Sequence, residues 1–134
     1  MAENTMKLEV ITPERSFYTG DVTFVELNTT EGEVGSYARL IPMTMITAPG
    51  VLTITEEDGT KKKAALLKGF VEVTETTMSI LAEVAEWPED IDVERAKKAE
   101  ERARKRLETK SADIDIARAE LALKRALVRK GLKA

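Results

Sequence analysis

From Lys7 to Ala85, short apolar runs alternate with polar positions and are separated by turn residues, which is typical of β-strands. We expect strands at 7–12, 22–27, 43–47, 51–56, 61–67, 68–73 and 78–82. Asp58-Gly59 lies between two of these segments, and this dipeptide strongly favours a tight hairpin turn. Many short strands joined by frequent turns predict an antiparallel β-sandwich or barrel.

The apolar period changes after Trp87-Pro88, where Ala, Glu, Lys and Arg become the dominant residues. These residues favour helix, and proline suits the first turn of a helix. We expect helices over 91–107 and 114–130. Ser111 or Asp113 is expected to cap the second helix, and Gly131 to end it.

The predicted fold class is therefore α+β, with an antiparallel β-sandwich over 1–87 and a two-helix antiparallel hairpin over 88–134. The first helix carries a narrow stripe of small apolar residues that includes Ala96 and Ala103. Small residues let two helices approach closely but bury little area, and a hairpin of about 40 residues is marginal alone. We expect the hairpin to pack on the sandwich or on another chain, and to change position readily.

Charge is divided unevenly along the 134 residues, although the net value is only −3. Residues 1–90 hold 16 Asp and Glu against 7 Lys and Arg, whereas residues 91–134 hold 8 against 14. An acidic body thus carries a basic tail, and such asymmetry steers association with charged partners. Nucleic-acid binding is disfavoured, because the tail has no aromatic residue for stacking and mixes its cations with acids.

The residue inventory argues against an enzyme. The chain has no Cys and no His, which removes a thiol nucleophile, an imidazole base and the usual zinc ligands. The carboxylates Glu56, Glu57 and Asp58 flank the predicted turn, and Glu31 and Glu33 form a second pair without a basic partner. No run approaches about 18 apolar residues, so we expect no membrane span, and we expect no signal peptide.

Several stretches, taken in order, resemble the epsilon subunit of bacterial F-type ATP synthase. They are residues 8–14, 30–35, 48–52, 69–73, 80–83, 91–96 and 118–122, together with Pro42. The resemblance covers nearly the whole chain and implies the same two-part fold.

The resemblance also implies a non-catalytic subunit of the central rotor stalk, bound to the gamma subunit and to the ring of c-subunits. It implies that the hairpin inhibits ATP hydrolysis when it extends toward the alpha/beta catalytic hexamer. The expected location is the cytoplasmic side of the cell membrane, as a peripheral part of the complex. No insertion into the membrane and no nucleic-acid partner is expected.

One loop departs from the family pattern. After Gly35, Ala38 stands where the family has proline, and Leu40 stands where it has histidine. This loop is implied to help contact the c-ring, so Glu33 and Leu40 are the nearest candidates for that contact in this chain.

The stretch 91–96 matches the pattern [Ile/Leu]-Asp-x-x-Arg-Ala of ATP-binding family members of the Bacillus-like type. The resemblance implies ATP as a regulatory ligand that is not hydrolysed, with or without Mg²⁺, and no protein metal site. It assigns to the base and sugar Glu86, Ile91, Asp92, Arg95 and Ala96, and to the phosphates Arg102, Arg125 and Arg129.

The geometry of an antiparallel hairpin agrees with this assignment, because the start of the first helix then lies near the end of the second. The arginines can converge only when the hairpin is folded. Two alternatives remain open: Asp92 caps the first helix and pairs with Arg95, and the chain is a rotor adaptor that binds no nucleotide. Trp87 either joins the helices to the sandwich or lines the nucleotide pocket.

Overall fold

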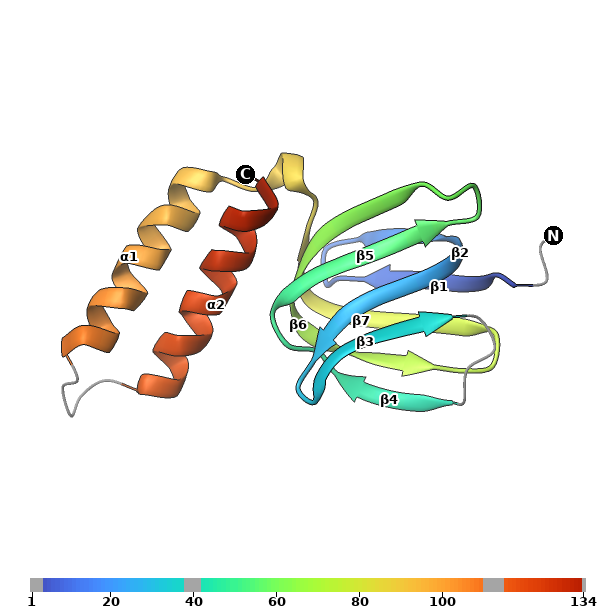
Figure 1. Ribbon diagram of the computed structural model, residues 1–134, viewed down its shortest axis with the longest axis horizontal. Helices are drawn as coiled ribbons and strands as arrows, with labels where there is room; N and C mark the ends of the chain where they lie inside the picture. The colour runs from blue at the N-terminus through green and yellow to red at the C-terminus, as the bar shows by residue number, and fades with distance from the viewer. Residues whose placement is uncertain (1–3, 38–41, 110–114, 134) are drawn as a thin grey trace.

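The computed structural model describes residues 4–37, 42–109 and 115–133. A β-domain holds the strands, and a helical hairpin stands at one side of it (Figure 1). The elements are β1 (Met6–Ile11), β2 (Ser16–Thr29), β3 (Gly32–Tyr37), β4 (Met43–Ile46), β5 (Gly50–Glu56), β6 (Lys61–Val73), β7 (Thr77–Glu86), a 3₁₀ turn (Pro88–Asp90), α1 (Val93–Thr109) and α2 (Ile116–Lys133).

The strands wrap around one core. Strand pairing runs β1–β7–β6–β5–β2 and closes because β2 also pairs with β1, while β3 adds to β2 and β4 adds to β6. The pairings are antiparallel except that β1 and β7 run parallel. The long strands β2 and β6 pair with different partners along their lengths, which lets them pass from one layer to the other. The predicted sandwich is confirmed.

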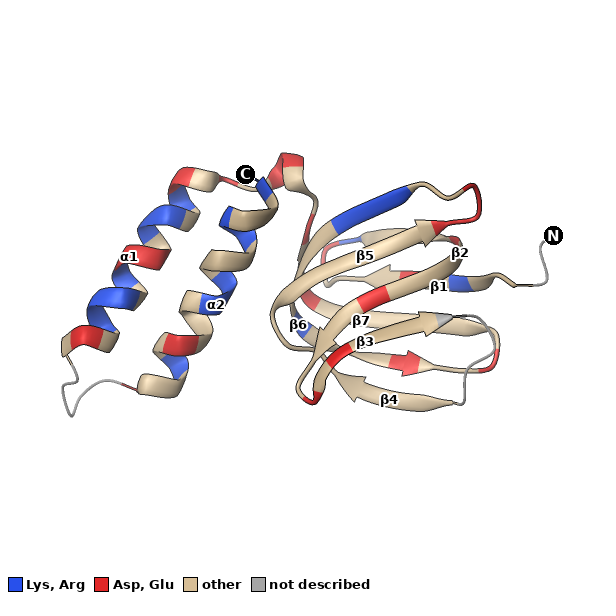
Figure 2. Ribbon diagram, viewed as in Figure 1, with Lys and Arg blue, Asp and Glu red and all other residues tan. Residues whose placement is uncertain are grey.

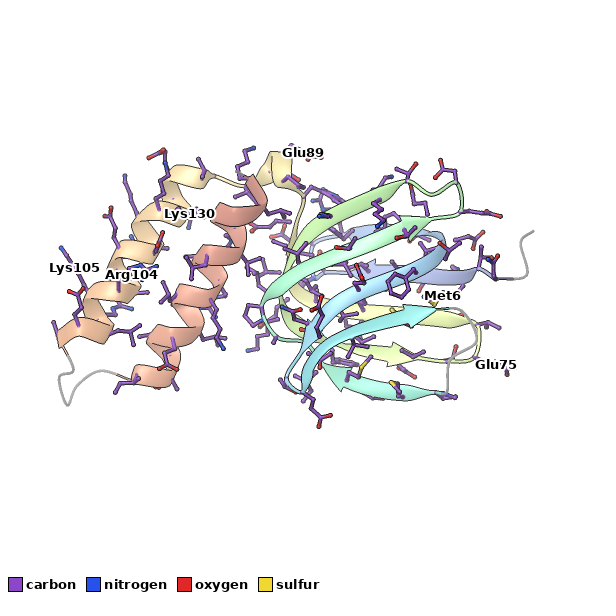
Figure 3. The ribbon with its side chains drawn as sticks, in the orientation of Figure 1. Met6, Glu75, Glu89, Arg104, Lys105 and Lys130 are labelled. Carbon is purple, nitrogen blue, oxygen red and sulfur yellow. The ribbon has the colours of Figure 1, made fainter. Side chains whose placement is uncertain are left out.

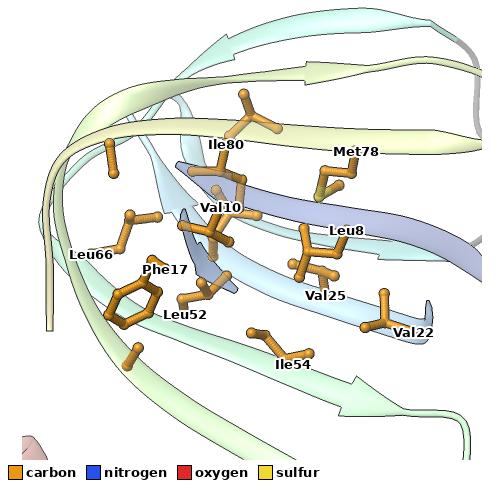
Figure 4. Close-up of a cluster of buried hydrophobic side chains, with 14 of the residues drawn as sticks. Leu8, Val10, Phe17, Val22, Val25, Leu52, Ile54, Leu66, Met78 and Ile80 are labelled. Atoms are coloured by element: carbon orange, nitrogen blue, oxygen red, sulfur yellow. The ribbon is translucent and has the colours of Figure 1, made fainter. Parts of the chain in front are cut away.

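The interior of the sandwich is filled by aliphatic side chains (Figure 4). They alternate along β1, β5 and β7, as a two-residue period requires when one face is buried. The fully buried ones include Leu8, Val10, Val22, Val25, Leu27, Leu52, Ile54, Leu66, Val71, Met78 and Ile80. Phe17 closes one end of this core, where its ring stacks on Trp87 with centroids 4.4 Å apart.

Two glycines are required by the backbone around β6. Gly59 has φ of 88° in the turn between β5 and β6, so the hairpin predicted at Asp58-Gly59 is confirmed. Gly69 lies at a register shift between β6 and β7, and a Cβ there would lie 2.2 Å from the Leu81 carbonyl oxygen. The close approach of the two backbones therefore excludes a side chain at position 69.

The hairpin is joined to the sandwich by a second, smaller apolar cluster. Ile91 is only 4% exposed and packs with Ala65 and Leu67 of β6, while Val128 and Leu132 of α2 cover them. Of the two expected supports, the sandwich and another chain, the structure shows the hairpin packed on the sandwich. Trp87 packs against the sandwich core instead, so its contact is with Phe17 and Tyr18.

The predicted end of the second helix is wrong. Helix α2 continues through Gly131 to Lys133, because the Lys133 amine reaches the Pro88 carbonyl oxygen at 3.0 Å and Leu132 is held in the junction cluster. The cap of α2 is Asp115, whereas Ser111 and Asp113 lie outside the described residues.

Candidate functional site: an arginine-lined groove between the helices

The two helices begin in the same way. The Asp92 carboxylate accepts a hydrogen bond from the Arg95 backbone N–H at 3.1 Å, and Asp115 accepts one from the Arg118 N–H at the same distance. An aspartate in this position satisfies an otherwise unpaired N–H and complements the positive end of the helix. The Ile-Asp-x-x-Arg-Ala stretch therefore starts with a helix cap, and the motif alone does not define a ligand site.

Alanines form the contact between α1 and α2. Ala96 and Ala103 of α1, and Ala119 and Ala126 of α2, are buried with seven-residue spacing in each helix. A seven-residue step is nearly two helical turns, so each pair lies on one face. The side chains on the two sides of this alanine contact lie on two opposite flanks of the hairpin.

One flank forms a groove that most of the predicted residues line. A hollow of about 340 Å³ is lined by Glu86, Asp90, Asp92, Arg95, Ala96, Ala99, Arg102 and Arg129. A second hollow of about 200 Å³ adjoins it, shares Ala99, Arg102 and Arg129, and adds Ala103, Arg106, Ala122, Arg125 and Ala126. We call these two hollows together the arginine groove.

The structure thus brings together seven of the eight predicted site residues along the arginine groove. Six of them line the first hollow, and Arg125 lines the second. The Ile91 side chain lies instead in the apolar cluster beneath α2. Its neighbour Asp92 points the other way, so Ile91 fixes the start of α1 while Asp92 lies at the groove.

The arginine groove contains cations without counter-charges. Among the described residues, the side chains of Arg95, Arg102 and Arg125 form no ion pair, whereas Arg129 donates to a Glu86 carboxylate oxygen at 2.6 Å. The first hollow has three carboxylates beside its three arginines, whereas the lining of the second hollow has four arginines and no carboxylate. The second hollow is therefore the part of the groove suited to phosphates, because guanidinium binds phosphate oxygens in pairs.

On the opposite flank of the hairpin, two cations are paired with a carboxylate. Glu100 accepts hydrogen bonds from Arg104 and from Lys130, both at 2.9 Å, and so joins α1 to α2. Figure 3 labels Arg104 on α1 and Lys130 on α2. These bonds, first that of Lys130 and then that of Arg104, lower the pKa of the Glu100 carboxyl. Arg104 and Lys130 on this flank are therefore paired within the protein, in contrast to Arg95, Arg102 and Arg125 of the groove.

Sequence reasoning did not assign six of the lining residues to the site: Asp90, Ala99, Ala103, Arg106, Ala122 and Ala126. Three of these, Asp90, Ala99 and Arg106, show why. The signal for two of them was present, since Ala99 and Arg106 follow Arg95 and Arg102 by four residues on the same helical face. Asp90 lies in the 3₁₀ turn, whose direction the helical period does not predict.

The sandwich carries a separate apolar surface. Ile46, Phe70, Leu81 and Ile11 are cross-strand neighbours on β4, β6, β7 and β1, and all four are exposed, Ile46 by 62%. Register neighbours point to the same face of a sheet, so they form one continuous line, here called the apolar row. Large apolar side chains grouped on a surface are typical of a protein interface.

Other candidates from the sequence are placed differently or lie outside the described residues. Glu33 is an exposed residue of β3. Ala38 and Leu40 are not among the described residues. Neither described helix is long and apolar enough to cross a membrane.

The fold and the groove define a small β-sandwich subunit that carries a cationic helical hairpin (Figure 2). The family model "ATP synthase, Delta/Epsilon chain, beta-sandwich domain" matches residues 5–88, and "ATP synthase, Delta/Epsilon chain, long alpha-helix domain" matches residues 89–129. The chain therefore belongs to the ATP synthase delta/epsilon-chain family, and the resemblance inferred from the sequence is confirmed.

Curated relatives match over almost the whole chain. A protein named ATP synthase epsilon chain from Syntrophomonas wolfei is 44% identical over 129 residues, which is 96% of this chain and 94% of that protein. Proteins of the same name from Shouchella clausii and Halalkalibacterium halodurans are each 46% identical and cover 93% and 91% of this chain, and 92% of each relative.

Solved structures agree. A chain in the Euglena gracilis mitochondrial ATP synthase structure (OSCP, F1 and c-ring) superposes with a TM-score of 0.83 at 26% identity, over 95% of this chain and 80% of that chain. A chain in the Tetrahymena thermophila mitochondrial ATP synthase central stalk and c-ring has the same fold, with a TM-score of 0.69 at 14% identity, over 96% of each chain.

Proposed function

We propose that this chain is a non-catalytic rotor subunit of an F-type ATP synthase, and that its folded hairpin binds ATP as a regulatory ligand. In this role the sandwich binds the gamma subunit and the c-ring, peripheral to the cell membrane on its cytoplasmic side. The family and the names of its relatives support the rotor role. The unpaired arginines of the groove are the observation that carries the nucleotide role.

The apolar row is the surface proposed to bind gamma. Aromatic and aliphatic side chains at the centre of an interface contribute most of its binding energy. Phe70 is flanked in register by Ile46 and Leu81, so burying it also covers its neighbours. Glu33 remains the proposed c-ring contact within the described residues.

A charge substitution in the apolar row tests the rotor role. Phe70→Glu is expected to weaken binding to purified gamma by about 30-fold, because an interface centre then buries a carboxylate. Phe70 is 41% exposed, so the variant should still fold. Thr55→Glu places the same charge on β5, outside the row, and should bind normally. Equal binding by both variants would locate the gamma contact elsewhere.

The arginine groove suits ATP because its two hollows adjoin and share Arg102 and Arg129. Arg102 lines both hollows and Arg125 only the second, so phosphates could extend from the first hollow toward the second. The base and sugar then lie toward Glu86, Asp92 and Arg95, with Mg²⁺ able to accompany the phosphates.

Regulation follows from the way the groove is built. Its walls come from both helices, so ATP binds only the folded hairpin and stabilises it by mass action. When ATP is scarce, the hairpin opens more readily and extends toward the alpha/beta hexamer, where it inhibits ATP hydrolysis. The cationic helices would meet acidic surface there. The shift cannot exceed the difference in ATP affinity between the two states.

Hydrolysis of the bound ATP is not part of the proposal. The chain contains no His or Cys, and the sequence has no Gly-x-x-x-x-Gly-Lys phosphate loop. The groove therefore offers cations that bind phosphates, without a group placed to activate water.

Isothermal titration of the full chain with ATP tests the nucleotide role. Arg102→Gln is expected to weaken ATP binding by about 10- to 100-fold, which is the effect of losing a charge-assisted hydrogen bond. Arg104→Gln is the matched control, since Arg104 lies two residues on, faces the opposite flank and pairs with Glu100. No heat from the unmodified chain at millimolar ATP would favour the alternative of a rotor adaptor without nucleotide.

A further inference from the structure

Residues 87–91, here called the connector, lead from the sandwich to the hairpin, and the sandwich holds both ends of this segment. At the first end, the Trp87 ring stacks on Phe17, with ring centroids 4.4 Å apart and the planes inclined by 15°. At the second end, Ile91 is 4% exposed and lies in the junction cluster with Ala65 and Leu67 of β6. The connector is therefore packed as part of the sandwich.

The connector also has hydrogen bonds of its own. The Asp90 N–H donates to the Trp87 carbonyl oxygen at 3.0 Å, and the Ile91 N–H donates to the Pro88 carbonyl oxygen at 3.2 Å. Pro88 adds rigidity, because its ring fixes one backbone dihedral angle. The two anchoring side chains, Trp87 and Ile91, are thus held at a fixed spacing by the turn between them.

Arg15 ties the connector to the loop between β1 and β2. Its guanidinium group lies 3.7 Å from the Asp90 carboxylate and 5.5 Å from the centre of the Phe17 ring, on which Trp87 stacks. Both charged side chains of the pair are more than half exposed, so the pair adds little stability. It orients the 3₁₀ turn on the sandwich.

Helix α2 holds the hairpin on the sandwich. Its Val128 and Leu132 side chains pack on the junction cluster. Near its end it also makes polar contacts with residues before α1, which are Arg129 to Glu86 and Lys133 to the Pro88 carbonyl oxygen. Breaking the contacts of α2 would free the hairpin, whereas the connector would keep its own contacts with the strands.

We propose that the connector stays on the sandwich when the hairpin moves, and that the hairpin pivots at Asp92. Asp92 lies between Ile91, the last residue of the connector, and Val93, the first residue of α1. Hinges commonly lie at such ends of elements, where a few residues absorb the change in backbone angles. The inference rests on the hairpin movement of the proposed function.

This pivot gives Ile91 a role in the moved state. If Ile91 stays in place, it still covers Ala65 and Leu67 after Val128 and Leu132 have left. The movement then exposes less apolar area to water, which makes opening less costly. The moving part of the chain begins at residue 92, whereas the boundary expected from the sequence lies between residues 87 and 88.

Two variants of the full-length chain test the pivot, Val128→Glu and Leu132→Glu. Each places a carboxylate against the junction cluster and is expected to release α2, because an unpaired charge is costly to bury. Leu127→Glu is the matched control, since Leu127 adjoins Val128 and is 41% exposed. In each release variant, the cluster methyl groups that α2 retains, those of Leu132 or of Val128, report by nuclear Overhauser contacts whether α2 is in place.

Both release variants are expected to lose the Overhauser contacts between α2 and the cluster and to keep those between Ile91 and Leu67. Trp87 is the only tryptophan of the chain, so its emission reports the first end of the connector. Quenching of this emission by acrylamide is expected to be the same in the release variants, the control and the unmodified chain. The control is expected to keep every Overhauser contact of the cluster.

Three results would overturn the inference. Loss of the contacts between Ile91 and Leu67 together with those of α2 would show that Ile91 leaves with the hairpin. Stronger quenching of Trp87 in the release variants would place the pivot at or before residue 87. Contacts of α2 that persist in both variants would show that the junction cluster does not hold the hairpin. The proposed function fails separately, when the unmodified chain binds neither ATP nor gamma, because this experiment uses no ligand.

Discussion

At the scale of single residues, Asp92 and Asp115 have matching local roles. Each caps a helix by accepting the N–H of the third residue along, and each precedes a buried alanine. Their surroundings differ, because Asp92 lines the arginine groove near Glu86 and Arg129. Comparing these two aspartates can therefore separate helix capping from ligand binding, two roles of Asp92 that the sequence alone left open.

Substituting each aspartate in turn tests this difference. Asp92→Ala and Asp115→Ala are both expected to destabilise the hairpin by about 1 kcal/mol, the usual effect of losing an aspartate cap. Only Asp92→Ala is expected to weaken ATP binding beyond that shared effect. Urea unfolding followed by helical circular dichroism measures the first quantity, and ATP titration the second. If both variants lower ATP affinity equally, Asp92 serves as a cap and nothing more.

The sequence predicted that most of the candidate site residues lie together, and it did not predict that Ile91 packs in the junction cluster. Arg95 and Arg102 are seven apart, so helical geometry alone places them on one face. Ile91 precedes the first turn of α1, where no helical period applies, and the sandwich recruits it for the junction cluster. The Glu86–Arg129 pair joins residues 43 positions apart, so nothing local in the sequence predicts it.

At the scale of elements, the strands with buried alternating residues were predicted and the irregular ones were not. Strand β3 was missed, because Gly32–Tyr37 has two glycines and only Val34 as an aliphatic residue, and it forms by adding to β2. Strand β2 is longer than its apolar segment, since its first part through Gly20 and Asp21 is held by pairing with β1. Pairing with a neighbour here overrides weak local propensity.

The contacts of the helices are also set partly by local pattern and partly by neighbouring elements. Ala96 and Ala103 belong to the alanine stripe predicted for the first helix, and Ala119 and Ala126 are the buried alanines of α2, which the sequence did not single out. The helix–sheet contact depends on a few residues near the end of α2. Beyond that contact, Ile116, Leu121 and Leu127 of α2 are exposed. A hairpin attached at one end, with apolar residues left uncovered, is suited to a change of partner.

At the scale of the whole molecule, the two proposed roles, rotor binding and nucleotide binding, belong to two separate surfaces. The apolar row lies on β4, β6, β7 and β1, and the arginine groove lies between the helices, so neither occupies residues of the other. Under the proposed function, the sandwich would remain bound to its rotor partner while the hairpin responds to nucleotide. This separation is the central claim of the account.

Amide hydrogen exchange of the full chain, with and without ATP, tests that claim most directly. At ATP concentrations about 100 times the dissociation constant, amides of α1 and α2 that exchange through hairpin opening should slow by about 100-fold. Core amides of β1, β5 and β7 should exchange at the same rate in both samples. Helix exchange that is unchanged by saturating ATP would contradict the account.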